Sequence, residues 1–351
     1  MKNNIIILFI FLSFGHLLSA QSPKEKIQAL LDEIQKEHPE TGISIGIRYE
    51  DKITYHHRGN LERNGAVPID EYSVFEIASI TKLLTGNLIA QAIQEEKIKA
   101  TDYMDAYLPA GFQLQKGIQK KIRITDLASH QSGLPDIDFP KLIAQNPQQP
   151  IQSITKDTIY KIINDCNRLK DYGSYRYSTV GFVLLGQILE QLYGKSYEAI
   201  VKENIIVPLQ LKRTLTKDFQ VKNITHGYNL EGGEQELFHW NIVAPAGLIK
   251  SSAADMMTYL NAISTSNGTF REAAILAEKK YYQDENIIIG LGLNILEDSS
   301  HTIYAKTGDS LGQSSVMAYD GKGKWAVVIL LNQHNSKLRS DLFNAIYEIL
   351  Q

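Results

Sequence analysis

The chain has 351 residues and a formal net charge of −3, from 36 basic and 39 acidic side chains. This near-neutral balance argues against a nucleic-acid partner, and the length allows a large core in one composite domain or two. The single cysteine, Cys166, excludes an internal disulfide. It lies within a helical pattern over 158–169, and we expect a packed thiol rather than a nucleophile.

The first 20 residues have the pattern of a secretory signal. Lys2 precedes an apolar run over 5–14, and small residues suited to cleavage end at Ala20. The run is shorter than the about 20 residues of a membrane span, although an uncleaved anchor is the alternative. We therefore expect a secreted or periplasmic bacterial protein whose mature part, 21–351, has no membrane span.

The N-terminal end of the mature part predicts a helix and a strand hairpin. Residues 23–38 have the apolar spacing of an amphipathic helix. Residues 42–49 alternate three isoleucines with smaller or polar residues, which predicts a strand with one buried face. Residues 52–57 can return as its hairpin partner.

The C-terminal end predicts three strands and a closing helix, with Ser336 as the helix cap. The strand candidates are 302–306, 314–319 and 325–331. Between the ends the pattern is mostly helix and loop, and we expect an exposed loop at 145–152. The predicted helices of this middle part are 82–96, 125–130, 181–193, 197–205 and 253–264.

These patterns predict an α/β part beside an all-α part. The sheet is antiparallel, is built from both chain ends (about 21–75 and 285–351) and is flanked by helices. The helical part (about 76–284) is inserted between them. A cleft between two such parts is a preferred place for a ligand site.

Ser79 and Lys82 are the first candidate site residues. Three residues apart on a helix, they lie on one face, so the amine can reach the hydroxyl. A serine hydroxyl needs a neighbouring base to become a nucleophile. Taken alone, the same spacing is common on solvated helix surfaces.

Tyr177 is the second candidate, because it lies just before a predicted helix and can project into a cleft. A phenol ordinarily titrates near about 10, and an adjacent ammonium favours the phenolate, which is a usable base. Tyr172 and Tyr175 compete for this role, and any of the three can instead be a packing residue.

Lys306, Thr307 and Gly308 end a predicted strand. A cation and a hydroxyl there can hold a substrate carboxylate, and glycine allows close approach. The alternative is a lysine that protects a sheet edge. The segment from Thr125, a predicted helix cap, to the turn 130–135 is interpreted as structural.

Together and in this order, these motifs resemble the serine β-lactamase and penicillin-binding-protein superfamily. The tyrosine-type middle motif is closest to the branch of class C β-lactamases, D-stereospecific peptidases and related esterases. The resemblance extends over nearly the whole mature chain. The similar segments are 75–82, 124–135, 177–186, 207–209, 245–248, 251–259, 290–293 and 306–308.

The resemblance implies a role for each motif. Ser79 is the nucleophile, and Lys82 and Tyr177 share the proton transfers. The substrate is held by Lys306, Thr307, Gly308 and Thr179. The oxyanion hole consists of the backbone N–H groups of Ser79 and Asp309.

Two residues depart from the family pattern. Thr179 stands where asparagine is usual, and it is shorter and offers a different hydrogen-bonding group. Asp309 adds a carboxylate after the third motif, where we expect it to compete for Lys306. Both departures bear on the substrate and leave serine acylation intact.

We therefore expect an exported serine hydrolase that forms an acyl-enzyme on D-amino-acid peptides or β-lactams. The alternatives are an esterase or amidase of the same fold, acting on small neutral substrates, and a slowly deacylating penicillin-binding receptor. No cofactor or metal is expected, because the nine histidines show no ligand spacing. The expected partner is a small-molecule or peptide substrate, and the sequence does not set the oligomeric state.

Overall fold

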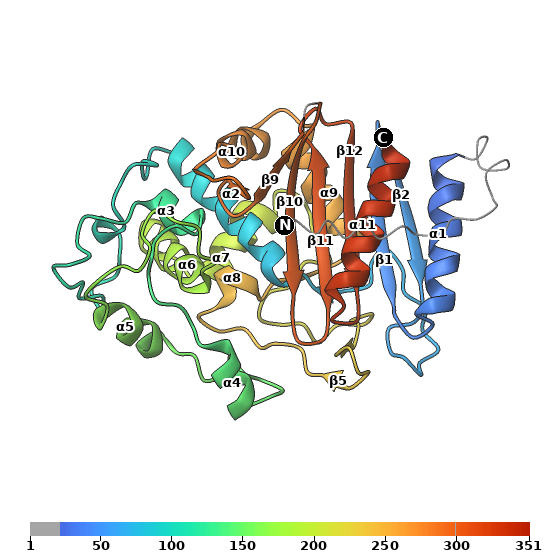
Figure 1. Cartoon of the computed structure of the whole chain (residues 1–351), viewed down its shortest axis with the longest axis horizontal. Coiled ribbons are helices and arrows are strands. Elements are labelled where there is room, and N and C mark those ends of the chain that lie inside the picture. The colour runs from blue at the N-terminus through green and yellow to red at the C-terminus, as the bar shows by residue number, and fades with distance from the viewer. Residues whose placement is uncertain (1–21, 299) are drawn as a thin grey trace, which may run out of the picture.

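The computed structural model describes residues 22–298 and 300–351 (Figure 1). The expected signal segment, 1–20, lies outside the described residues. The helices are α1 (Pro23–Glu37), α2 (Thr81–Gln94), α3 (Ile124–Ala128), α4 (Phe139–Gln145), α5 (Lys156–Asn164), α6 (Thr179–Tyr193), α7 (Tyr197–Val201), α8 (Ala244–Gly247), α9 (Ala253–Ser264), α10 (Thr269–Ala277) and α11 (Ser336–Leu350). Shorter helical turns are η2 (Ala78–Ile80), η3 (Met104–Ala106) and η4 (Lys202–Ile206).

Eight strands form one antiparallel sheet in the order β2-β1-β12-β11-β10-β9-β8-β7. The strands of this sheet are β1 (Ile43–Tyr49), β2 (Lys52–Arg58), β7 (Tyr282–Gln283), β8 (Ile288–Ile289), β9 (Asn294–Glu297), β10 (Thr302–Asp309), β11 (Ser314–Asp320) and β12 (Trp325–Leu331). Two small pairs are formed by β3 (Phe75–Glu76) with β6 (Lys250–Ser251) and by β4 (Gly227–Tyr228) with β5 (Glu234–Gln235). The predicted sheet from both chain ends is confirmed.

Helices cover both faces of the sheet, as the residues of β12 show. Its residues alternate between two hydrophobic clusters, as strand geometry requires. Trp325 and Val327 belong to the cluster with α1 and α11, whereas Ala326 and Val328 belong to the cluster with the helical part. Figure 1 shows α11 lying along β11 and β12, while α9 contacts β1 and β12. The sheet is thus the middle layer of three.

The expectation that β1 has only one buried face is wrong. Ser44, Gly46 and Arg48 are buried as well, because α9 covers their face. A Cβ on Gly46 would clash with the Met257 side chain of α9, so glycine permits this close packing. Arg48 is accommodated by a hydrogen bond to Ser264 Oγ at 3.0 Å.

Two predicted helix caps are also wrong. The side chain of Asn335, not Ser336, accepts the N–H of Leu338 at the start of α11. Thr125 lies inside α3, which begins at Ile124. The helix α11 begins one residue earlier than a Ser336 cap would allow, and α3 begins two residues earlier than a Thr125 cap would allow.

The helical part is continuous with the sheet part in one core. A single hydrophobic cluster includes residues from Leu61 to Leu330 and thus from both predicted parts. The boundaries predicted between these parts, near 75 and 285, stay predictions. Cys166 is buried there, and burial raises the pKa of its thiol, as expected of a packed cysteine. Within residues 22–298 and 300–351, no helix is both long and apolar enough to cross a bilayer.

Leu342→Ala tests the packing of α11 against the sheet. Leu342 is fully buried in the cluster beneath α11, and removing a buried leucine side chain costs about 2–5 kcal/mol of unfolding free energy. Lys337→Ala on the exposed side of the same helix is the control, expected within about 0.5 kcal/mol of wild type. Urea titration measures both, and equal stabilities would contradict the packing.

Candidate active site

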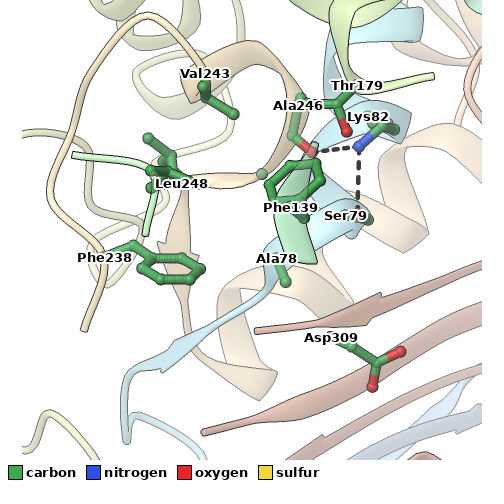
Figure 2. Close-up of a pocket in the computed structure, with 12 residues that line it drawn as sticks. Ala78, Ser79, Lys82, Phe139, Thr179, Phe238, Val243, Ala246, Leu248 and Asp309 are labelled. Atoms are coloured by element: carbon green, nitrogen blue, oxygen red, sulfur yellow. Dashed lines mark hydrogen bonds between the residues drawn. The ribbon is translucent and has the colours of Figure 1, made fainter. Parts of the chain in front are cut away.

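Ser79 lies in η2, immediately before α2, and is half-buried. The preceding residue, Ala78, has φ 45°, a left-handed conformation that costs energy for alanine. The sharp turn places the Ser79 side chain at the wall of a pocket (Figure 2). Strained backbone of this kind persists only where the surrounding packing holds it.

The strand β10 supplies part of that packing through Gly308. A Cβ on Gly308 would clash with Ile77 O and lie 3.0 Å from Ser79 N. The hydroxyl of Ser315 on β11 lies within hydrogen-bond distance of two carbonyl oxygens, Ile77 O at 3.0 Å and Gly308 O at 3.2 Å. The glycine therefore allows the sheet to approach the backbone of Ser79 directly.

Lys82 reaches Ser79 as the helical spacing predicts. Its Nζ lies 3.3 Å from Ser79 Oγ and donates to Ala246 O at 2.7 Å, and Figure 2 shows it between these two groups. Its side chain is buried, and burial lowers the pKa of Lys82 to about 7 despite the opposing effect of Asp136. Because Ala246 O can only accept, it orients one N–H and leaves the rest of the amine toward Ser79.

Tyr177 is the tyrosine that meets Ser79, since its Oη lies 2.8 Å from Ser79 Oγ. Tyr172 instead donates to Asp126 Oδ2 at 2.8 Å. The ring centroid of Tyr177 is 4.9 Å from Lys82 Nζ and 5.1 Å from Lys306 Nζ. Tyr177 thus connects the candidate nucleophile with both lysines.

The N-terminus of α6 fixes the position of Tyr177. Asp136 accepts the N–H groups of Thr179 at 2.7 Å and Val180 at 3.0 Å, and His130 Nδ1 accepts the N–H of Ser178 at 3.0 Å. The His130 ring also packs against the Tyr177 ring with centroids 4.4 Å apart. His130 therefore has a structural contact as expected, whereas Asp136 was not identified from the sequence.

Lys306 points toward the same site from β10. The strand extends to Asp309 instead of ending at 306. Lys306 pairs with Met317 of β11, but the pairing with β9 ends at Ala305, so among the described residues 306–309 have no strand partner on that edge. Its side chain is buried, and burial together with the charge of Lys82 lowers the pKa of Lys306, against the attraction of Tyr177. Thr307 is exposed, and Thr179 lines the pocket beside Ser79.

The expected competition of Asp309 for Lys306 is wrong. The Asp309 carboxylate accepts from Arg339 Nη1 of α11 at 2.6 Å and from Ser314 Oγ at 2.6 Å. Alternate strand residues point to opposite faces of the sheet, which places Asp309 with α11 rather than with Lys306. In Figure 2 the Asp309 carboxylate points away from Ser79.

The apolar part of the pocket beside Ser79 was not predicted, because Phe139, Ile151, Phe238 and Val243 belong to no motif. Phe139 and Ile151 form one part of the wall, and Phe238, Val243 and Leu248 form another. Ile151 is buried although 145–152 was expected to be an exposed loop, so that expectation is wrong at its C-terminal end.

This geometry suits acyl transfer. A hydroxyl lies within hydrogen-bond reach of two groups that can exchange protons, and one of them is an amine whose pKa is near neutrality. Such an arrangement can activate a serine without a histidine base.

Comparison with known proteins agrees with this chemistry. The beta-lactamase family model matches residues 27–351. A beta-lactamase of Pseudomonas fluorescens is 23% identical over 77% of this chain and 73% of its own length. Penicillin-binding protein 4* of Bacillus subtilis is 26% identical, but the match spans 55% of this chain and only 42% of the relative.

Solved structures show the same fold. A class C beta-lactamase superposes with a TM-score of 0.82 at 18% identity, over 93% of this chain and 95% of that one. A beta-lactamase/D-alanine carboxypeptidase from Pseudomonas syringae gives a TM-score of 0.81 at 18% identity, over 93% of this chain and 98% of its own. The chain therefore belongs to the beta-lactamase family of serine hydrolases and has the fold of class C beta-lactamases.

Proposed function

We propose that the protein forms an acyl-enzyme at Ser79 on carboxylate-bearing substrates, namely D-amino-acid peptides or β-lactams. The observation that carries the proposal is the double contact of Ser79 Oγ, 3.3 Å from Lys82 Nζ and 2.8 Å from Tyr177 Oη. A hydroxyl with two proton-exchanging neighbours and a pocket beside it is arranged for nucleophilic attack.

In this mechanism Ser79 Oγ attacks the substrate carbonyl while its proton passes to the neutral amine of Lys82 or to Tyr177 in its phenolate form. The same pair then delivers the proton to the leaving nitrogen or oxygen. Water attacks the resulting ester in the second half, with the proton transfers reversed. The N–H groups of Ser79 and Asp309 stabilise the oxyanion, and each such donor is worth about 3 kcal/mol in typical enzymes.

The two lysines support the choice of a carboxylate-bearing substrate. Within the described part of the chain, neither Lys82 nor Lys306 lies within ion-pair distance of a carboxylate. Lys306 can therefore hold a substrate anion without displacing an internal partner. The alternative of an esterase on neutral substrates is favoured by the apolar pocket wall.

We also propose export, on the basis of the signal pattern in 1–20. N-terminal sequencing of protein recovered from the periplasm or medium tests it: a new terminus near Gln21 agrees, and an intact cytoplasmic chain contradicts it.

Ser79→Ala tests the nucleophile. The variant has no attacking oxygen, so it should lose all covalent labelling by a fluorescent penicillin and by a fluorophosphonate. Ser336→Ala, at an exposed serine on α11, is the matched control and should label like wild type. Turnover of a chromogenic cephalosporin, a D-Ala-D-Ala peptide and a p-nitrophenyl ester by the wild type then ranks the substrates. Undiminished labelling of Ser79→Ala would refute the assignment.

The pH profile tests Lys82 as the base. Burial lowers the pKa of Lys82 to about 7, so the amine holds an extra proton below this pH and is neutral above it. We expect kcat/KM for a neutral ester to rise with pH through an apparent pKa near about 7, because kcat/KM reports groups of the free enzyme. Lys82→Arg, which stays charged, should be far less active and lack this limb. A flat wild-type profile between about pH 6 and about pH 8 would exclude this role.

Lys306→Ala tests carboxylate recognition. A hydrogen bond to a charged group contributes about 1.5–3 kcal/mol, so KM for the peptide or cephalosporin should rise about 10- to 100-fold. KM for the neutral ester should change much less. If both substrates are affected equally, Lys306 has a structural or proton-transfer role and the alternative esterase function gains support.

A further inference from the structure

Positive charge is concentrated on a part of the surface that the proposed reaction does not use. Residues 113–123 and 166–170 contain six basic side chains and no acidic one, in a chain of net charge −3. All six basic residues are exposed, and in the described ranges none lies within ion-pair distance of a carboxylate. We propose that they dock the protein on an anionic phospholipid bilayer, a property that goes beyond the proposed hydrolysis. This basic patch consists of Lys116, Lys120, Lys121, Arg123, Arg168 and Lys170.

Contacts between the two segments bring these cations together. A Cβ on Gly117 would clash with Asn167 O, so the two backbones touch at this point. The hydroxyl of Tyr172, just after the second segment, lies 2.8 Å from Lys121 O in the first. Figure 1 shows the chain between α2 and α3, which includes the first segment, at the end of the molecule opposite α1. The patch therefore forms one end of the helical part.

The carboxylates near the basic patch do not neutralise it. Asp165 and Asp171 are already paired, with Lys161 at 3.0 Å and Arg176 at 2.8 Å. Like charges gathered without counter-ions repel one another, so an anionic partner stabilises this arrangement. Three further carboxylates are buried or half-buried and accept backbone N–H groups instead of pairing with the exposed cations. They are Asp102, Asp105 and Asp126, which accept from Lys99, Lys120 and Arg123.

Two exposed tyrosines lie among the cations and favour a lipid surface as the anionic partner. Tyr103 and Tyr172 are 39% and 45% exposed. Tyr103 forms a backbone bridge with Arg123, and Tyr172 contacts Lys121 as described above. Tyrosine combines an apolar ring with a polar hydroxyl and is enriched at the headgroup level of membranes, where lysine and arginine meet lipid phosphates. A nucleic acid is the poorer partner, because the net charge of the whole chain is slightly negative.

Docking through the basic patch leaves the catalytic pocket free. No residue of the patch lines the pocket beside Ser79. The bilayer and the substrate thus contact different residues. Membrane docking and hydrolysis can therefore be measured separately on one protein.

Co-sedimentation of the full chain with lipid vesicles tests the docking. The protein should sediment with an equal mixture of phosphatidylcholine and phosphatidylglycerol, and not with phosphatidylcholine alone. Binding should weaken steeply between about 0.05 M and about 0.5 M salt, because salt screens exposed charges. A retained apolar segment 1–20 would bind both kinds of vesicle, so the difference between the two lipids carries the test.

Lys121→Gln combined with Arg168→Gln removes one cation from each segment. Each Lys or Arg near an anionic surface strengthens binding about fivefold, so this double variant should bind the mixed vesicles about 25-fold more weakly. Lys24→Gln combined with Lys36→Gln is the matched control. It makes the same change in net charge at two exposed lysines of α1 and should bind like wild type. Both double variants should hydrolyse a soluble p-nitrophenyl ester at the wild-type rate, because neither changes the pocket.

Tyr103→Trp reports whether the patch itself meets the bilayer. A tryptophan at this position should shift its fluorescence emission to shorter wavelength when the mixed vesicles are added, because the indole enters a less polar environment. Tyr72→Trp, at a position that is 53% exposed and outside the patch, is the control and should show no shift.

The outcomes decide the inference without reference to Ser79. Selective binding to the mixed vesicles that is weakened in Lys121→Gln/Arg168→Gln and kept in Lys24→Gln/Lys36→Gln supports docking through the patch. Equal binding to both lipids, no binding to either, or equal loss in the two double variants overturns it. Binding of the wild type to a DNA duplex or to heparin, but not to the mixed vesicles, also overturns it. The lipid and salt dependence of the wild type decides the question even if a variant does not fold.

Discussion

The proton-transfer role proposed for the site depends on the burial of Lys82. A lysine with 1% of its side chain exposed is costly to keep charged, and burial accordingly lowers its pKa to about 7. Its orientation requires Ala246 O of α8 at a fixed place. Thr85 of α2 donates to Pro245 O at 2.7 Å, which fastens α8 to the helix that carries Lys82. The lowered pKa and the orientation of the amine are therefore properties of how these helices pack, not of the Ser79–Lys82 spacing alone.

On the other side of Ser79, the position of Tyr177 depends on a second constraint, which is the hydrogen bonding at the start of α6. Its first N–H groups are satisfied by His130, Asp136 and Ser178 Oγ, so the loop that carries Tyr177 has little freedom. Burial, helped by the charges of Lys306 and Lys82, lowers the pKa of His130 well below its usual value. The ring packed against Tyr177 is thus neutral at physiological pH, and it adds no third positive charge to a site that already holds two lysines.

Features set by local spacing were predictable from the sequence. Ser79 and Lys82 meet because residues three apart on a helix share a face, and Tyr177 projects from the residue before a helix N-cap. Features set by contacts between distant segments were not predictable. The Arg339 side chain that holds Asp309 lies 30 positions away, and the pocket wall joins residues of α4 with the loop around Phe238. No periodicity or short motif encodes such pairings, which arise only when the sheet and helical parts pack together.

The distribution of buried charge follows from the same packing and bears on the substrate. Lys250 is compensated by Glu76, and Arg339 by Asp309. In the described ranges, Lys82 and Lys306 form no such pair, and burial lowers the pKa of both despite the opposing effects of Asp136 on Lys82 and of Tyr177 on Lys306. Two close, uncompensated lysines are least costly when one is neutral and the other faces an anion. Because Lys82 contacts Ser79, Lys82 is suited to be the lysine that loses its proton. Lys306 is then the cation with which a substrate carboxylate would pair.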